Sequence, residues 1–183
     1  ITRAIVERAQ VDGVPVIRLS KPEGYELNDK RLEEADRWIA DVLKPVVDSM
    51  PKLRTVAGQD FGRDGDLSYF AAFQEQGAGA WREALALELR RIPFDVQHKI
   101  VSWLLAELPL WHHTKFDARG NGQAHAEALL QQYGPARVEC VMATPAWYGE
   151  HFPKYKAALE DRSVGIAKGE DVIADHRRVV LKN

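Results

Sequence analysis

The order of apolar runs after residue 50 constrains the fold of this chain more than any other feature. Three strand-like runs come first, over residues 53–61, 67–74 and 83–90, and glycine-bearing segments at 62–66 and 77–79 lie between them. Segments this short between apolar runs are typical of hairpins, so the three strands are expected to pair antiparallel. The sequence therefore predicts an antiparallel meander at the start of a sheet.

Helical and strand-like patterns alternate after this meander. Pro93 opens a segment whose apolar residues recur at helical spacing, and a strand is predicted over Trp111–Asp117. Further elements are expected as a helix over 121–133, a strand over 137–142, a helix from 144 that Pro153 kinks or restarts, a helical turn at 171–175 and a strand at 179–181. This order predicts an α/β protein with a ribonuclease H-like mixed sheet and helices on both faces.

Residues 1–50 show a different pattern. Strand-like runs at residues 4–6 and 14–17 flank the turn signal Asp12-Gly13. A helix is expected from residue 28 or 29 until Pro45 interrupts it, because Leu32, Ala35, Ile39, Val42 and Leu43 share one face. The chain begins at Ile1 rather than Met, so it is expected to be a piece of a longer protein. We interpret residues 1–50 as a connector or the tail of a preceding domain, and residues 51–183 as one domain.

Two aspartates end predicted strands in the same way. Asp60 closes the first strand and is followed by Gly62, whereas Asp117 closes the fourth and is followed by Gly120 and Gly122. Hard divalent cations prefer carboxylate oxygens, and phosphodiester hydrolysis by two metals needs several of them around ions about 3.5–4 Å apart. The pattern favours a metal-dependent nuclease. The alternative, that each aspartate is a solvated cap or turn residue, stays open at this point.

Composition narrows the class of protein. The formal net charge is −2, so nucleic acid is not bound by bulk positive charge, although cations held by the acids would supply charge locally. No apolar stretch approaches the ~20 residues that a membrane span needs, and no Gly-rich phosphate loop ending in Lys-Ser/Thr occurs. The single Cys140 indicates a reducing compartment and is interpreted as a core residue rather than a nucleophile.

Three segments resemble one viral protein family. Residues 58–67 (GQDFGRDGDL) resemble the first nuclease motif of phage terminase large subunits, and residues 116–122 (FDARGNG) resemble the second. Residues 142–161 (MATPAWYGEHFPKYKAALED) resemble the Mu-like subgroup of that family. The resemblance covers about residues 50–180, and the order and spacing of the segments are more specific than any one of them.

The family joins an amino-terminal packaging ATPase to a carboxy-terminal ribonuclease H-like nuclease. The resemblance implies that residues 51–183 are this nuclease, an endodeoxyribonuclease in which Asp60 and Asp117 are catalytic ligands of Mg²⁺ or Mn²⁺. The family's third acid lies on a late helix, expected here beyond Asn183, and Asp175 is the late acid of the chain that could take its catalytic place. With only two strong carboxylates, we expect weak metal binding and low activity from the 183-residue chain.

Basic residues next to the two acids are candidates for binding double-stranded DNA. Arg63 and Arg119 follow the acids closely and are expected to contact phosphates, with loop solvation as the alternative, and Lys115 would extend the track. The resemblance further implies a terminase small subunit, a portal protein and the ATPase domain of the same polypeptide as partners. It also implies the cytoplasm of the bacterial host as the location, without a membrane.

Other classes of function compete with this interpretation. Residues 60–65 also suit a phosphate loop of actin-like or sugar-kinase ATPases, but those proteins need a second such loop and about twice the length. A Holliday-junction resolvase shares the expected fold, yet its late pair of acids has no counterpart here. The third alternative is a docking module of a packaging motor whose nuclease has decayed. Asp60 and Asp117 argue against that decay, whereas the missing third acid favours it.

Overall fold

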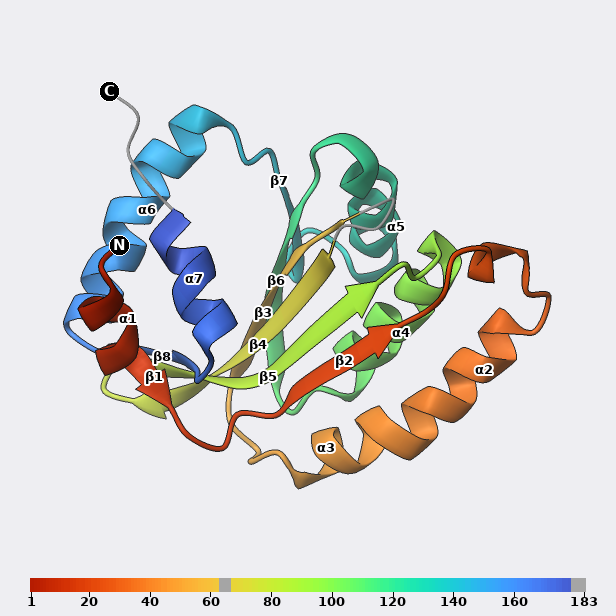
Figure 1. Cartoon of the computed structure of the whole chain (residues 1–183), viewed down its shortest axis with the longest axis horizontal. Coiled ribbons are helices and arrows are strands. Elements are labelled where there is room, and N and C mark those ends of the chain that lie inside the picture. Colours follow the sequence, from red (N-terminus) through yellow and green to blue (C-terminus); the bar gives the residue numbers. More distant parts are fainter. Residues whose placement is uncertain (63–66, 179–183) are drawn as a thin grey trace.

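One mixed β-sheet forms the centre of the computed structural model, which describes residues 1–62 and 67–178 (Figure 1). Hydrogen-bonded neighbours in the sheet follow the order β1-β8-β5-β4-β3-β6-β7, and β2 pairs with β5 outside this path. The strands are β1 Gln10–Val11, β2 Val16–Ser20, β3 Thr55–Asp60, β4 Leu67–Gly77, β5 Ala80–Arg90, β6 Trp111–Asp117, β7 Val138–Val141 and β8 Val164–Ala167. The α-helices are α1 Arg3–Ala9, α2 Arg31–Trp38, α3 Lys44–Ser49, α4 Phe94–Glu107, α5 Gln123–Tyr133, α6 Pro145–Glu160 and α7 Glu170–Arg178.

Strands β3, β4 and β5 form the predicted meander. Each pairs antiparallel with the next, and the turn between β4 and β5 has positive φ at Ala78 and Gly79, as a tight hairpin turn of the primed type requires. Strand β6 then pairs with β3 in parallel, and β7 pairs with β6 in parallel. Helices α4 and α5 make the two crossovers that this arrangement needs. The predicted adjacency of the Asp60 and Asp117 strands is confirmed.

One face of the sheet carries the larger hydrophobic core. Phe70 of β4, Leu87 of β5 and Phe116 of β6 are almost completely buried there, because side chains alternate between the two faces along each strand. Helices α2 to α5 pack on this face, and α4 contributes the buried Ile100 and Leu104. Burying one such side chain stabilises the fold by about 1.5–3 kcal/mol, so this core holds the meander and the crossover helices together.

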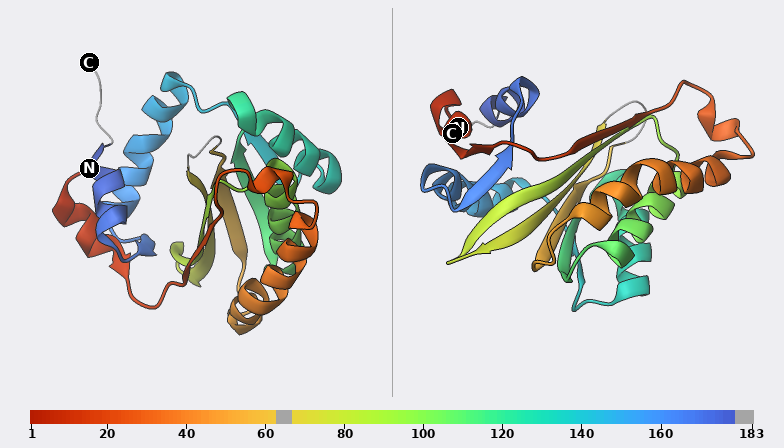
Figure 2. Two further views of the ribbon diagram at one scale, coloured as in Figure 1. Left: turned by 45° about the vertical axis from the view of Figure 1, so that its right-hand side comes forward. Right: turned by 90° about the horizontal axis from the view of Figure 1, so that it is seen from below.

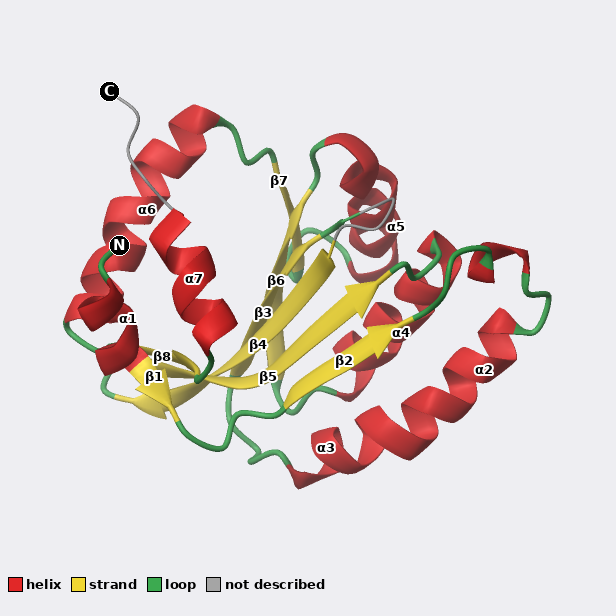
Figure 3. Cartoon of the chain, viewed as in Figure 1, coloured by secondary structure: helices red, strands yellow, loops and turns green. Residues whose placement is uncertain are grey.

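A second apolar cluster joins the helices that lie on the other side of the sheet. It consists of Ile5, Val6, Ala9, Leu159, Ile166 and Ile173, from α1, α6, β8 and α7. Figure 2 shows these helices and the α2–α5 group on opposite sides of the sheet, and Figure 3 marks the strands between them in yellow. The predicted mixed sheet with helices on both faces is therefore confirmed.

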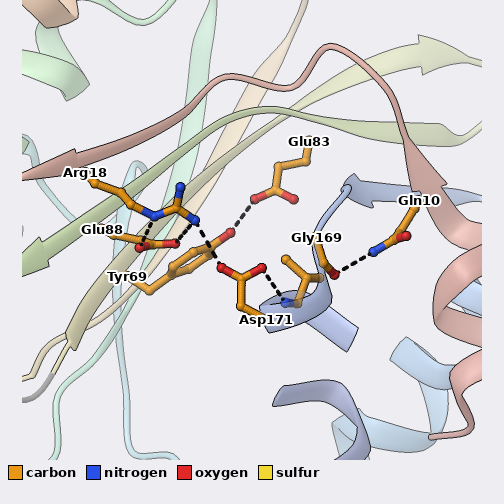
Figure 4. A network of polar contacts seen from close by, with 8 residues as sticks. Gln10, Arg18, Tyr69, Glu83, Glu88, Gly169 and Asp171 are labelled. Atoms are coloured by element: carbon orange, nitrogen blue, oxygen red, sulfur yellow. Dashed lines mark hydrogen bonds and ion pairs between the residues drawn. The ribbon is translucent and has the colours of Figure 1, made fainter. Parts of the chain in front are cut away.

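Polar contacts attach the start of α7 to the amino-terminal strands (Figure 4). Arg18 of β2 donates to Glu88 of β5 at 2.8 Å and to Asp171 of α7 at 3.0 Å. Gln10 of β1 donates its side-chain amide to the Gly169 carbonyl oxygen at 3.1 Å. Exposed ion pairs of this kind contribute little energy one by one, but together these contacts hold the α7 start against β1 and β2.

Glu83 is a buried carboxylate beside this network (Figure 4). The Tyr69 hydroxyl donates to one of its oxygens at 2.9 Å, and the Ala167 backbone N–H donates to the other at 2.7 Å. Burial raises the pKa of Glu83, and both hydrogen bonds and the nearby His176 oppose that rise. Because each oxygen has a donor, Glu83 ties β4 and β5 to β8 as a satisfied structural acid.

The structure corrects the sequence prediction in the helices. Residues 4–6 belong to α1 rather than to a strand, and the buried Ile5, Val6 and Ala9 line one side of that helix. Pro45 does not end the second helix, because a π-helical segment, Ile39–Leu43, precedes it and α3 continues with the proline in its first turn. The Lys44 N–H bonds the Ile39 carbonyl oxygen across the wider π-helical turn, and Pro45, which has no N–H to donate, follows directly after it. Helix α6 runs through Pro153 without restarting.

The sequence prediction also missed a strand. Residues 164–167 form β8, which pairs in parallel with both β1 and β5. Helix α7 is longer than the predicted turn, and the strand predicted over 179–181 lies outside the described residues. Residues 1–50 supply β1 and β2, so this segment is hydrogen-bonded into the sheet. Within the described ranges, no helix is long and apolar enough to cross a membrane.

A buried polar pair lies behind β3 on the main core face. His125 Nε2 and Gln59 Oε1 are 3.0 Å apart, and both side chains are almost completely buried. The rings of Phe61, Phe94 and Phe116 pack around His125. This burial, with a smaller effect of the nearby His98, lowers the pKa of His125 to about 4. The imidazole is therefore neutral in the folded protein at neutral pH.

We expect acid to destabilise the fold through His125. Its pKa in the folded state lies below the ordinary value of 6.5, so its contribution is complete above pH 6.5 and is lost as the pH falls towards 4. Going from pH 7 to pH 5 should lower the free energy of unfolding by about 2 kcal/mol, as measured by urea denaturation. The His125→Gln variant cannot titrate and should lose that much less. An equal loss in both proteins would contradict the assignment.

Candidate active site

Asp60 and Asp117 end two neighbouring parallel strands and project from the same face of the sheet. In the β3–β6 ladder Gln59 is opposite Phe116, so the next residue of each strand is an aspartate. Gln59 and Phe116 both contact His125 on the main core face. Because side chains alternate along a strand, the two aspartates point to the opposite face. The structure thus brings the two predicted acids together.

The two carboxylates repel one another. The pKa of Asp60 is raised, first by the loss of water around its carboxylate and then by the negative charge of Asp117, while Arg119 and the Phe61 N–H oppose the rise. Excess negative charge of this kind is what a divalent cation neutralises. Neighbouring groups shield part of the Asp60 carboxylate from water, but the residue as a whole remains exposed, so the strand end is open to solvent. A donor set of carboxylate oxygens fits the hard cations Mg²⁺ and Mn²⁺.

No further acid completes this pair within the described part of the chain. Over residues 1–62 and 67–178, no three His, Cys, Asp or Glu side chains are grouped so that they could hold a metal ion. Asp175, the predicted late acid, lies exposed on α7 and pairs with Arg178 at 3.2 Å. It is not grouped with Asp60 and Asp117.

The loop after β6 brings Arg119 to the site. Its backbone N–H donates to Asp117 Oδ1 at 3.0 Å, and its guanidinium Nε lies 3.8 Å from Asp117 Oδ2. Gly120 has a φ of 56°, which glycine adopts without strain. A Cβ at Gly122 would overlap the Asp117 carbonyl oxygen and lie 3.2 Å from the Phe61 Cβ. Glycine at 122 therefore lets the loop pack tightly against the ends of β3 and β6.

Lys115 and Arg63, the other two residues predicted to contact DNA, have weaker structural support than Arg119. Lys115 lies two residues before Asp117, on the same face of β6, but its ammonium group pairs with Glu139 of β7 at 3.1 Å. His113 also approaches Glu139, at 3.4 Å. Part of the charge of Lys115 is thus neutralised within the sheet. Arg63 lies outside the described residues.

Sequence reasoning missed Tyr148, an aromatic side chain beside the acids. The Arg119 guanidinium carbon lies 5.9 Å from the centre of its ring. Burial raises the pKa of Tyr148, and the charges of Asp117 and Asp60 add to this while Arg119 opposes it. The available signal was Thr144, whose hydroxyl caps α6 by accepting from the Trp147 N–H at 3.3 Å. A helix that starts just after β7, the neighbour of β6, has its first turns near Asp117.

Two curated proteins match almost the whole chain. It is 33% identical over 180 residues to the "Probable terminase, large subunit gp28" of Escherichia phage Mu, covering 96% of this chain and 33% of that protein. It is 34% identical over 186 residues to the Mu-like prophage FluMu protein gp28 of Haemophilus influenzae, covering 100% and 37%. The chain is homologous to part of these gp28 proteins of a Mu-like phage and prophage. It spans about a third of the length of these relatives, and no family model matches it.

Solved structures support the fold of this gp28 homologue. The large terminase nuclease from thermophilic phage G20c with bound zinc matches with a TM-score of 0.59 and 18% identity, covering 72% of this chain and 73% of that chain. The same nuclease with bound magnesium matches with a TM-score of 0.56 and 18% identity, covering 68% and 63%. At this identity the likeness concerns the fold, which is the predicted ribonuclease H-like one.

We expect Gly122→Ala to destabilise the loop between β6 and α5. The added methyl group would press on the Asp117 carbonyl oxygen and on Phe61, and such overpacking costs about 1–3 kcal/mol. Gly149→Ala on α6 is the matched control, because nothing lies within 4 Å of its added Cβ, and it should be neutral or stabilising by up to ~1 kcal/mol. Urea denaturation of the two variants measures the difference. Equal stability would show that the loop has room at residue 122.

Proposed function

We propose that this gp28 homologue is a metal-dependent endonuclease domain of a viral genome-packaging terminase large subunit, which cuts phosphodiester bonds of double-stranded DNA. The observation that carries the proposal is the Asp60–Asp117 pair at the ends of two adjacent strands, with the pKa of Asp60 raised by partial loss of water and by the charge of its partner. Homology to the probable terminase large subunit gp28 of phage Mu and a fold like that of the G20c nuclease support it.

Asp60 and Asp117 would hold Mg²⁺ or Mn²⁺ through their carboxylate oxygens. Structures of the G20c nuclease with magnesium, zinc and cobalt support a divalent-metal site in this fold. When bound, two such ions supply an activated water and stabilise the charge that develops on the phosphate as the 3′ oxygen departs. Asp60 and Asp117 would hold the ions beside the strand ends. With two carboxylates, this chain is expected to bind metal weakly.

Arg119 would contact the DNA backbone beside the cut. Nearly half of its side chain is exposed, and its only ion pair in the described structure is the long one to Asp117. Lys115 is a weaker candidate because Glu139 shares its charge. Arg63 is proposed from its place in the motif alone.

The rest of the polypeptide is proposed by analogy with the relatives, which are about three times as long. A packaging ATPase domain would precede residue 51, with residues 1–50 as its tail or the connector. This connector would also complete the nuclease sheet, since β1 and β2 pair with β8 and β5. A terminase small subunit, a portal protein and DNA would be the partners, in the cytoplasm of the bacterial host.

A second candidate is a docking module of the packaging motor with little or no nuclease activity. The observation in its favour is that the described residues offer two clustered acids rather than three. Another ribonuclease H-like nuclease, such as a junction resolvase, is the alternative within the same fold. Metal binding and DNA cleavage separate these functions.

We expect Mn²⁺ to raise the melting temperature of the wild-type protein and not that of Asp60→Asn. In metal-free buffer, Asp60→Asn should melt at the same or a higher temperature, because it removes the repulsion between the two carboxylates. Asp48→Asn is the control: this exposed acid pairs with Lys44 on α3, and the variant should keep the Mn²⁺ shift. If Mn²⁺ shifts all three proteins equally, the metal binds elsewhere.

We expect wild-type protein to nick plasmid DNA in Mg²⁺ or Mn²⁺, and Asp60→Asn and Asp117→Asn to do so only at background level. Each substitution changes a ligand atom and not a packed core residue, so the variants should remain folded, as circular dichroism can verify. Asp175→Asn should have a much smaller effect. The assay also uses a chain extended past Asn183, which should cut faster. Undiminished nicking by both variants would reject the site, whereas a wild type that binds Mn²⁺ without cutting would favour the docking module.

A further inference from the structure

Aromatic side chains form two stacks along α6 beside the carboxylate pair. Trp147 stacks on His151 with ring centres 4.2 Å apart and 12° between the planes, and Tyr148 stacks on Phe152 at 5.0 Å and 16°. The two stacks touch where Trp147 and Tyr148 meet edge to face at 5.4 Å. Side chains four residues apart are neighbours on a helix, so these pairs are a local property of α6.

Neither hydrophobic core accounts for these rings. The main cluster and the smaller cluster of the described residues do not include Trp147, Tyr148 or Phe152, and all three are only half-buried. Elsewhere along α6, Leu159 alone is completely buried. The aromatic half of α6 therefore packs against neither hydrophobic core and lies next to the ends of β6 and β7.

Tyr148 is the ring that reaches the site. The Arg119 guanidinium carbon is 5.9 Å from its centre, within the range of a cation–π contact. The same guanidinium has its Nε 3.8 Å from Asp117 Oδ2. Arg119 thus lies within reach of an aromatic ring and of a carboxylate that is needed for the cation.

The contacts of Arg119 with Asp117 and with Tyr148 differ in how many guanidinium N–H donors they leave free for a phosphate. A carboxylate engages the N–H edge of a guanidinium, which is also the edge that binds phosphate in a bidentate manner. An aromatic ring interacts with the guanidinium as a cation and leaves N–H donors for another acceptor. Tyr148 can therefore retain Arg119 at the site while its donors face a phosphate and Asp117 faces a cation.

We propose that Tyr148, supported by its stack on Phe152, is a positioning residue that holds Arg119 towards the phosphate beside the cut. The inference rests on the proposed nuclease function and assigns to α6 a part in binding the DNA backbone. The ring, and not the hydroxyl, carries this role: burial raises the pKa of Tyr148, so its hydroxyl stays protonated and is neither a base nor a nucleophile at neutral pH.

The test compares Tyr148→Phe, Tyr148→Leu, Arg119→Ala and the Tyr148→Leu/Arg119→Ala double variant in plasmid nicking with Mn²⁺. Tyr148→Phe should stay within about twofold of the wild-type kcat/KM. Loss of a cation–π contact predicts a decrease of about two- to fivefold for Tyr148→Leu, chiefly through KM. Arg119→Ala should fall further, and the double variant should equal Arg119→Ala because Tyr148 acts through Arg119. Trp81→Leu is the matched control, because it removes a ring 5.8 Å from the guanidinium of Arg54, next to the start of β3 and not to its Asp60 end.

Binding of a short DNA duplex in Ca²⁺, measured by fluorescence anisotropy, gives a readout without cleavage. The same order of affinities is expected, with no added loss in the double variant, and Tyr148→Met replaces Tyr148→Leu if the latter is not folded by circular dichroism. Independent losses from Tyr148 and Arg119, a loss in Tyr148→Phe equal to that in Tyr148→Leu, or a loss in Trp81→Leu equal to that in Tyr148→Leu would each overturn the inference. If the double variant binds DNA as well as Arg119→Ala does while neither the wild type nor any variant cuts DNA, the positioning role stands and the nuclease function fails.

Discussion

The parallel pairing of β3 with β6 is the interaction on which the rest of the site depends. Its register sets Gln59 against Phe116 in the core, so Asp60 and Asp117 must emerge together on the opposite face. A slip of one residue would turn one aspartate into the apolar surroundings of His125 and expose Phe116, which is now 1% exposed. The packing of Phe116 and its neighbours on the core face therefore keeps the two carboxylates together on the opposite face.

That register also compels two like charges to remain neighbours. The repulsion between Asp60 and Asp117 is a cost that the isolated domain carries, and the burial of residues such as Phe70 and Leu87 is large enough to offset it. The repulsion is only partly relieved by Arg119. Its guanidinium Nε lies 3.8 Å from Asp117 Oδ2, which is longer than a good hydrogen bond. A closer arginine would stabilise the fold but compete with any cation for the same oxygens.

The sequence predicted the parts of the fold that have long, regular patterns. Strands β3 to β7 and helices α4 and α5 come from runs whose periodicity is unambiguous, and the acids at two strand ends could be found for the same reason. Residues 4–6 could not be assigned, because three apolar residues in a row suit a helix as well as a strand. Strand β8 has four residues and owes its existence to β1 and β5 on either side. The Thr144 cap indicates that α6 starts near Asp117, but the contact of Tyr148 with Arg119 also depends on the direction in which α6 leaves β7, a tertiary relation that the sequence does not report.

The short strand β2 affects whether copies of the protein can associate strand to strand. Along residues 86–90 it occupies the outer edge of β5, a strand of 11 residues in which Leu87 and Leu89 are buried. Without β2, that edge would offer unpaired backbone donors and acceptors next to apolar side chains, which is a template for joining another copy strand to strand. In its place the sheet ends in five residues that carry the charged Arg18. By covering this edge of β5, strand β2 is expected to oppose edge-to-edge aggregation.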